Sequence, residues 1–404
     1  MRKHQGLTIL IICCCLGLLS GCWDVVELNK RAIVSGIGVD WKEEEKEYLV
    51  SFQTVIADEI SGKAGRGATP TSVYKASGKS VVEAMRNASR KVPRIISLAH
   101  TGLIVISDRV AREGIIDLFD YLDRDSDIRL NAEVLIATQG QTAEDVVSAM
   151  TPIGKITAFA LEQKIDLTSG QLGENFRIEV DDVIRGLLTP GGGPLVNGVM
   201  IEGSAEKASK METLKNAKVE GLAVISQMAV FKGDRLVSWL NADESRGTVW
   251  IRNKMKITPI HLKLLDQGGE ISLEVMRSKT RLLADLEDPA NPIIHIHVEP
   301  NFSIREVNSA IDLRNPATMK LLEDAASREV IRIMELAVRK SKKVNSDILG
   351  FGQAVERSDP SAWRKMKNRW DQLFPRVQVK YHVKPVIRNS QMRDRSVLYK
   401  IHNQ

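Results

Sequence analysis

The chain has 404 residues, of which 43% are apolar and 27% charged, and its formal net charge is +6 at pH 7. This is an ordinary globular composition, and the length exceeds a single ordinary core, so two or three domains are expected. A chain of this size can hold its fold by burial alone, which excludes a small scaffold that depends on disulfides.

The start of the chain predicts an export signal. Two basic residues, Arg2 and Lys3, precede an apolar run over about residues 7–19. That run is about 13 residues long, whereas a membrane-spanning helix needs about 20. Residues 1–21 are therefore predicted to be a signal peptide that is removed from the mature protein.

The residues that close this run predict a lipid anchor. Leu19, Ser20 and Gly21 stand directly before Cys22, a pattern that resembles the lipobox of bacterial lipoproteins, in which the cysteine thiol receives a diacylglyceryl group before cleavage. Two acyl chains anchor a protein stably, whereas one chain binds only marginally. Cys22 is thus the predicted lipidation site. The alternatives are a plain secretory signal and an uncleaved anchor with a chance cysteine.

All four cysteines lie in this segment, at positions 13, 14, 15 and 22. Cleavage before Cys22 removes three of them and leaves the fourth alkylated, so the 383 mature residues (404 minus 21) have no free thiol. The mature chain is therefore expected to form no intramolecular disulfide and to offer no thiolate to a metal or a substrate.

Charge is distributed unevenly along the mature chain. Residues 22–193 contain 20 basic and 26 acidic residues, whereas residues 194–404 contain 35 and 25. From Arg339 onward there are 16 basic and 5 acidic residues. On a lipid-anchored protein this bias predicts contact with anionic lipid headgroups or an acidic partner, and a solvated basic face is the alternative. Nucleic acid is a poor candidate partner, because the signal exports the chain from the cytoplasm.

Residues 22–193 form the predicted N-terminal α/β region, with room for two lobes. β-Branched or alternating apolar runs predict strands over residues 32–39, 48–56, 103–106 and 132–138. Capping residues and amphipathic stripes predict helices over residues 80–91 and 108–123 and after Thr142. The small and polar residues of 59–72 predict an exposed loop.

Residues 189–194 (TPGGGP) are the strongest break in the sequence. Two prolines that enclose three glycines do not fit inside a helix or strand, so a domain boundary or major loop is placed here. Residues 194–404 are then the predicted C-terminal α/β region.

Strands and helices also alternate in the C-terminal region. Strands are predicted over residues 222–231, 235–240, 271–286, 293–304 and 377–387, the first two flanking a Gly233-Asp234 hairpin turn. Asn241 caps one helix, and Asp359-Pro360 opens another that runs to about residue 373. Asn315-Pro316 opens a long helix over about 316–343, whose basic end suits the negative end of the helix dipole.

No motif supports catalysis, and no catalytic residue, metal site or cofactor is predicted. The stretch Ser77-Gly78-Lys79-Ser80 is similar to the end of a phosphate-binding loop. Such a loop also needs a glycine five residues before the lysine, where this chain has Tyr74, and a helix cap at Ser80 explains the same residues. His295 and His297 alternate on one face of a strand, near Glu299, but no third ligand stands at a suggestive spacing. A half-buried or partner-facing strand is the preferred interpretation of the two histidines.

Several stretches together resemble the Ger(x)C spore-germination lipoproteins. They follow the lipobox in the same order along nearly the whole mature chain: Cys22-Trp23-Asp24, Glu27-Leu28, residues 111–115, 121–125 and 128–129, Gly221-Leu222-Ala223, residues 229–237 (AVFKGDRLV), residues 244–247 (ESRG), residues 347–352 (DILGFG), Trp363, Trp370 and Phe374-Pro375. Residues 224–228 are an insertion or a repeated strand-like phrase within the most recognisable block.

This resemblance implies a fold and a function. The fold would be mixed α/β (α+β) with several domains, three sheet-plus-helix units behind the signal peptide. The protein would be the non-enzymatic C subunit of a nutrient germinant receptor, anchored on the outer face of the spore inner membrane beside membrane-embedded A and B subunits. Only Cys22 carries over as a functional residue.

Two other classes stay open. One is the solute-binding subunit of an importer, although aromatic residues are few for a ligand pocket, at 8 Phe, 6 Trp and 5 Tyr. The other is a surface-anchored hydrolase, for which the sequence offers no convincing acid, base or nucleophile.

Overall fold

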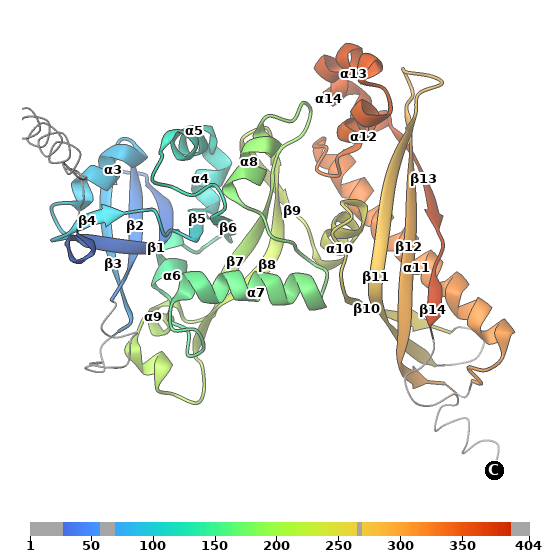
Figure 1. The fold of residues 1–404 in the computed structure, drawn as a ribbon, viewed down its shortest axis with the longest axis horizontal. Helices are drawn as coiled ribbons and strands as arrows, with labels where there is room; N and C mark the ends of the chain where they lie inside the picture. Colours follow the sequence, from blue (N-terminus) through green and yellow to red (C-terminus); the bar gives the residue numbers. More distant parts are fainter. Residues whose placement is uncertain (1–26, 57–68, 265–268, 310, 389–404) are drawn as a thin grey trace, which may run out of the picture.

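The computed structural model describes residues 27–56, 69–264, 269–309 and 311–388. Within these residues the chain is a mixed α+β protein built on two sheets, one from its first 240 residues and one from the remainder (Figure 1). The predicted class, α+β with more than one unit, is confirmed. Most of the predicted loop at 59–72 lies outside the described residues, and its end begins a strand that sequence reasoning did not find.

The described strands of the first sheet lie in the order β3-β2-β1-β5-β6-β7-β8-β9, with β4 beside β1. Its centre, from β1 to β7, is parallel, and antiparallel hairpins extend it on both sides. The strands are β1 (Arg31–Lys42), β2 (Glu47–Val55), β3 (Thr71–Gly78), β4 (Ile95–Ser97), β5 (Leu103–Ser107), β6 (Glu133–Ala137), β7 (Leu195–Gly203), β8 (Gly221–Lys232) and β9 (Arg235–Trp239).

Helices cover both faces of this sheet, so its central strands are apolar throughout. In β5, Ile104 and Ile106 point into one core, and Leu103 and Val105 point into the opposite one. The first face carries α3 (Val81–Ala88), α4 (Asp108–Glu113), α5 (Ile116–Arg124) and α8 (Val180–Leu187). The second face carries α6 (Ala143–Ser148), α7 (Thr157–Gln171) and α9 (Ala205–Ala208), and η2 (Met211–Leu214) follows α9.

Local capping chemistry places several of these helices where the sequence predicts them. Ser80 accepts a hydrogen bond from the N–H of Glu83 at the start of α3, and Thr142 with Asp145 forms a complete capping box on α6. The single helix predicted over 108–123 is wrong. It is divided into α4 and α5, because Gly114 adopts φ 136° between them.

The second sheet has the order β10-β11-β12-β13, with β14 also paired to β12. Its strands are β10 (Thr258–Lys263), β11 (Glu270–Asp285), β12 (Ile293–Asn308), β13 (Gln378–Val383) and β14 (Val386–Arg388). The long predicted helix is α11 (Pro316–Val344), capped by Asn315 and ended by Asn345 in the left-handed conformation. Its buried residues Val330 and Ile333 belong to the same hydrophobic core as the buried residues of β12.

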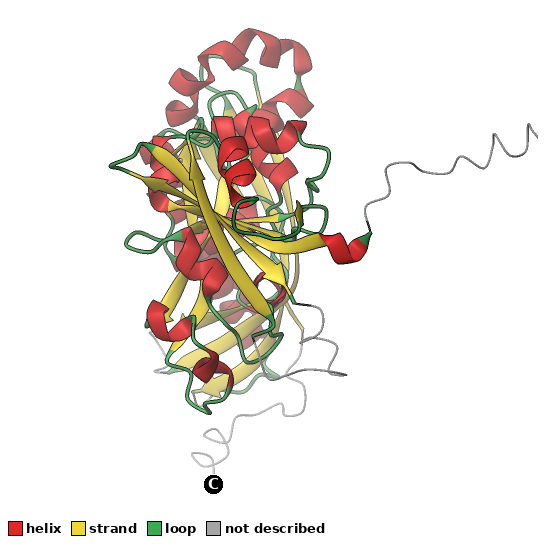
Figure 2. Cartoon of the chain, turned by 90° about the vertical axis from the view of Figure 1, so that its left-hand side faces the viewer, coloured by secondary structure: helices red, strands yellow, loops and turns green. Residues whose placement is uncertain are grey.

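Seven shorter helices complete the described fold: one precedes the first strand, one lies between β9 and β10, and five follow α11 (Figures 1 and 2). They are η1 (Leu28–Lys30), α10 (Ala242–Ile251), α12 (Phe351–Ser358), α13 (Pro360–Met366), η3 (Lys367–Arg369), α14 (Trp370–Leu373) and η4 (Phe374–Arg376). Asn241 caps α10 with a full capping box, as predicted. Gly247 lies so close to the backbone of Ile333 that a larger residue would collide there, which lets α10 pack tightly on α11.

The first sheet continues past residues 189–194, where the sequence predicts a boundary. After this loop, β7 pairs in parallel with β6 and antiparallel with β8. The described strands therefore form two sheets rather than three, and the strands pass to the second sheet after β9. The ranges 22–193 and 194–404 remain predictions about domains, and the strand pairing does not separate at that point.

Candidate functional site

The predicted lipidation site Cys22 and the lipobox residues Leu19, Ser20 and Gly21 lie outside the described residues, so their roles remain predictions. The described chain starts at Glu27, five residues after Cys22 (27 minus 22), and leads through η1 into β1. Five extended residues span at most about 17 Å. A lipid on Cys22 would therefore hold Glu27 within about that distance of the membrane surface, and η1 separates Glu27 from the start of β1. Among the described helices, none is both long and apolar enough to cross a bilayer.

A groove of about 930 Å³ lies beside the start of β1, and we call it the anchor-proximal groove. Its lining includes the basic residues Lys30, Arg86 and Arg94 and the acids Asp125 and Asp127. Between them, the apolar side chains of Val82 and Ile95 are 45% and 56% exposed. Cations next to exposed aliphatic groups are the combination that binds the interface of an anionic bilayer.

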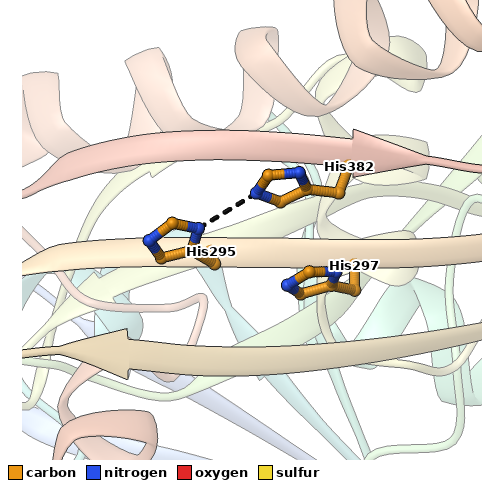
Figure 3. A group of neighbouring side chains, drawn as sticks. All are labelled: His295, His297 and His382. Atoms are coloured by element: carbon orange, nitrogen blue, oxygen red, sulfur yellow. Dashed lines mark hydrogen bonds between the residues drawn. The ribbon is translucent and has the colours of Figure 1, made fainter.

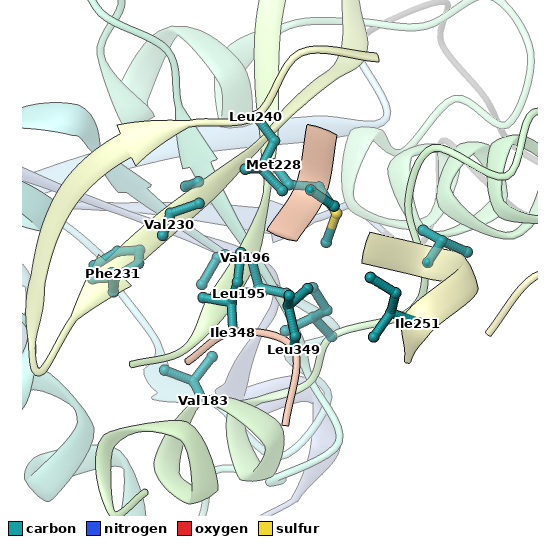
Figure 4. Packing of buried hydrophobic residues seen from close by; sticks show 14 of the residues in the cluster. Val183, Leu195, Val196, Met228, Val230, Phe231, Leu240, Ile251, Ile348 and Leu349 are labelled. Carbon is teal, nitrogen blue, oxygen red and sulfur yellow. The ribbon is translucent and has the colours of Figure 1, made fainter. Parts of the chain in front are cut away.

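Four segments that are distant in the sequence meet between the two sheets, and we call this region the junction (Figure 4). Its segments are residues 189–194, 228–233, 346–352 and 363–374. Figure 4 shows Phe231 and Leu195 of the first sheet near Ile348 and Leu349 of the C-terminal part, all in one buried cluster. Three of these segments contain the stretches that resemble the Ger(x)C proteins.

Asp347 is the polar centre of the junction and is only 4% exposed. Its carboxylate accepts hydrogen bonds from the N–H groups of Gly350 and Phe351 at 2.9 Å and of Gly352 at 2.6 Å. The indole Nε1 of Trp370 donates a fourth at 2.9 Å. Burial raises the pKa of Asp347 above its ordinary value, and the bonds from Gly352, Phe351 and Trp370 act in the opposite direction. A carboxylate with four donors is fully occupied in holding the local structure.

The glycine-rich loop forms the other side of the junction. Gly191 adopts φ 66°, and a Cβ added there would lie 2.7 Å from Cδ1 of Trp370. The N–H of Asp347 donates to the carbonyl oxygen of Gly191 at 3.1 Å. One residue earlier, Ser346 Oγ donates to the carbonyl oxygen of Phe231 at 2.6 Å. The loop predicted as a boundary is thus the surface on which the C-terminal helices sit.

A cavity of about 100 Å³ lies beside Asp347, large enough for water molecules. Arg252 lines it together with Asp182 and Arg185. Burial lowers the pKa of Arg252 below its usual range, while the charges of Asp347 and Asp182 raise it. The charges of these two carboxylates thus favour the cationic form of Arg252 at the junction.

Two further buried carboxylates belong to the first sheet. Asp40 accepts hydrogen bonds from the first two N–H groups of α6 at 2.8 and 3.0 Å, and burial raises its pKa to about 6. Glu133 accepts from the N–H of Ile178 at 3.2 Å and forms an ion pair with Arg177 at 2.7 Å. Burial raises the pKa of Glu133 to about 8, against the effects of both partners. Each of these acids is engaged with the backbone of the fold.

Sequence reasoning identified the stretches of the junction but not their roles. The signal that identifies Asp347 is local: an aspartate followed by glycines three and five residues later can accept their N–H groups in a tight turn. No local signal pairs Trp370 with Gly191. Sequence reasoning also found no third partner for His295 and His297, whereas the structure brings His382 beside them from β13.

Comparisons with known proteins agree across both parts of the chain. Residues 24–201 match the family model "Spore germination protein N-terminal domain", and residues 226–391 match "Spore germination B3/ GerAC like, C-terminal". The chain is 32% identical to spore germination protein KC of Bacillus subtilis (strain 168) over 387 residues, which is 94% of each chain.

Two further proteins of that strain are similar along most of their length. Spore germination protein B3 is 25% identical over 90% of this chain and 92% of its own, and spore germination protein A3 is 24% identical over 94% and 97%. The crystal structure of the GerBC protein aligns with a TM-score of 0.54 and 18% identity, covering 90% of this chain and 99% of that one. At that identity the alignment shows a shared fold.

Proposed function

The chain belongs to the Ger(x)C family of spore germination proteins, and from that membership we propose that it is a non-enzymatic, lipid-anchored subunit of a nutrient germinant receptor. The observation that carries the proposal is the agreement of both family models, in order, with a 32% identical relative over 94% of the chain. The family supports a role in germination. Lipid anchoring and assembly with A and B subunits are the finer parts of the proposal.

The geometry of the junction supports a scaffold role. Several stretches that resemble the family pack the two sheets together at the junction, and two of their polar side chains are buried there. Asp347 and Trp370, for example, are 4% and 0% exposed. Such buried contacts fix the position of the second sheet relative to the first. A subunit that presents surfaces to partners needs its parts fixed in this manner.

The position of the chain start supports lipid anchoring at Cys22. The short connection to Glu27 would place the anchor-proximal groove at the membrane, with its basic and aliphatic lining toward the headgroups. Two acyl chains supply most of the membrane affinity, and a basic surface adds to it and orients the body.

The basic C-terminal part is proposed to contact anionic headgroups as well. Some of its cations have internal partners: Lys340 lies 4.0 Å from Glu244, and Lys342 Nζ donates to the carbonyl oxygen of Val377 at 2.5 Å. The exposed cations of this part include a group on α13 and η3: Arg364, Lys365, Lys367 and Arg369.

Substitution of Cys22 tests the proposal. Spores that carry Cys22→Ala should lose the protein from the membrane fraction and respond weakly to nutrients, because the thiol that receives the lipid is absent. Cys14→Ala is the matched control, since it removes a thiol that cleavage discards, and it should behave as the unchanged protein. Normal nutrient germination with Cys22→Ala protein in the aqueous fraction would contradict the proposal.

A further inference from the structure

Three histidines from two strands of the second sheet lie close together (Figure 3). His295 and His297 alternate along β12 on the face opposite the buried residues Ile294 and Ile296. The parallel register of β12 and β13 places His382 directly beside His297. Eighty-five residues separate His297 and His382 in the chain (382 minus 297), so the pairing of these two strands alone creates the cluster.

The three rings lie close together and nearly parallel. The ring centroids are 4.4 Å apart for His297 and His382, and 5.2 Å apart for His295 and His382. His295 Nδ1 lies 3.0 Å from His382 Nε2. One ligand nitrogen from each ring can be chosen so that all three are within 4.8 Å of one another. Three imidazole nitrogens therefore converge on one small volume at the surface.

The surroundings of His297 oppose its protonation. Burial lowers the pKa of His297, and the neighbouring rings and the cations of Lys384 and Arg281 add to that effect. Lys380 lies beside His295 in the strand register, and Glu299 is the acid on the same face of β12. A neutral imidazole has a free lone pair, which is the form that binds a metal.

We propose that His295, His297 and His382 form a binding site for one divalent transition-metal ion of the zinc class. Imidazole is a preferred ligand of such ions, and three protein ligands leave a fourth position for water or a donor from a partner. In tetrahedral geometry, bonds of about 2.0–2.1 Å place ligand nitrogens roughly 3.3 Å apart. The rings are stacked in the structure without metal, so each would rotate about its side-chain bonds to aim a nitrogen at the ion.

The metal would have a structural consequence at the edge of the sheet. β13 forms the end of the strand order and is joined to β12, and it follows the helices α12 to α14. Because its ligands come from both strands, the ion would cross-link β13 to β12. The bound ion would therefore slow hydrogen exchange of the β13 amides, an effect that is independent of any role in germination.

A cobalt titration tests the site. Full-length protein in detergent, purified without a histidine tag, is titrated with Co²⁺ and then with Zn²⁺. We expect one equivalent of Co²⁺ with the visible absorption of a four-coordinate nitrogen site, displaced by Zn²⁺. His297→Gln and His382→Gln should each weaken binding by about tenfold or more, since even loss of a supporting residue costs about 10–100-fold.

His261→Gln is the matched control. His261 is an exposed histidine on β10 of the same sheet, hydrogen-bonded to Ser272 at 3.0 Å and outside the cluster, so its loss should leave the titration unchanged. Circular dichroism without metal checks that all variants fold. Absence of stoichiometric binding, or equal binding by the His382→Gln and His261→Gln variants, would overturn the proposal. So would β13 exchange that Zn²⁺ leaves unchanged.

Discussion

The indole of Trp370 donates a hydrogen bond to the carboxylate of Asp347 at 2.9 Å, and this bond joins the last helices of the chain to the turn after α11. The same turn meets the glycine-rich loop through the N–H of Asp347 and the carbonyl oxygen of Gly191. Trp370 also packs edge-to-face against Trp363, with ring centroids 5.3 Å apart. Through its side chain and its backbone N–H, the buried residue Asp347 thus links three segments that are distant in the sequence.

Trp370→Phe should destabilise the protein by about 1–3 kcal/mol, because it keeps most of the ring and leaves a buried carboxylate one donor short. Trp363→Phe is the control, since it changes a neighbouring indole outside the hydrogen bonds of Asp347 and should cost less. Denaturant unfolding of both variants measures the difference. A double-mutant cycle with Asp347→Asn isolates the bond, and purely additive effects would contradict the coupling.

Gly191→Ala should cost more than Gly140→Ala. Both glycines have positive φ, 66° and 88°, so each alanine carries the left-handed penalty of about 1–2 kcal/mol. A Cβ at Gly191 also meets the ring of Trp370, whereas nothing lies within 4 Å of one at Gly140. Overpacking adds about 1–3 kcal/mol. Equal unfolding midpoints for the two variants would show that Gly191 is not packed tightly against Trp370.

Glu133 should make the protein less stable as the pH rises. Its pKa is raised from 4.5 to about 8 in the fold, so the folded state holds the proton more tightly than the unfolded state. The free energy of unfolding should then fall between about pH 4.5 and 8, by up to about 1.4 kcal/mol for each pH unit. Outside that window Glu133 contributes no slope.

Glu133→Gln should remove this fall and raise the melting temperature most at pH 8 and above. Glu202→Gln, at an exposed position on β7, is the control and should leave the profile unchanged. Asp40, with a pKa of about 6, contributes in the same direction between about pH 4 and 6 and stays in both variants. A Glu133→Gln profile parallel to that of the parent from pH 5 to 9 would refute the assignment.

Reversal of two exposed cations, Arg364→Glu with Lys367→Glu, should weaken membrane-associated assembly. Each basic group near an anionic surface contributes about 1 kcal/mol, so a loss of tenfold or more is expected at low salt and less at high salt. Lys215→Glu with Lys218→Glu makes the same charge change on an exposed loop. Co-purification with spore membranes over a salt series measures both. Equal retention would mean that the C-terminal cations are a solvated face.

Features that depend on neighbouring residues could be predicted from the sequence. The caps at Ser80, Thr142, Asn241 and Asn315 each act within four residues, and each begins a helix in the structure. The apolar run of β5 has the length and composition of a strand buried on both faces.

Features that depend on long-range pairing could not be predicted. The loop at 189–194 has the composition of a linker, yet the first sheet continues beyond it because β7 pairs with β6. The end of β6 lies 58 residues before the start of β7 (195 minus 137). His382 joins His297 only through the register of two parallel strands. Contacts of this kind depend on topology, which periodicity and capping do not determine.

The most direct test of the central claim is the mass of the N-terminal peptide from protein isolated from spores. The account predicts that, in the membrane fraction, this peptide begins at Cys22 and carries a diacylglyceryl group on its sulfur. An unmodified Cys22, in protein recovered from the aqueous fraction of germination-competent spores, would contradict it.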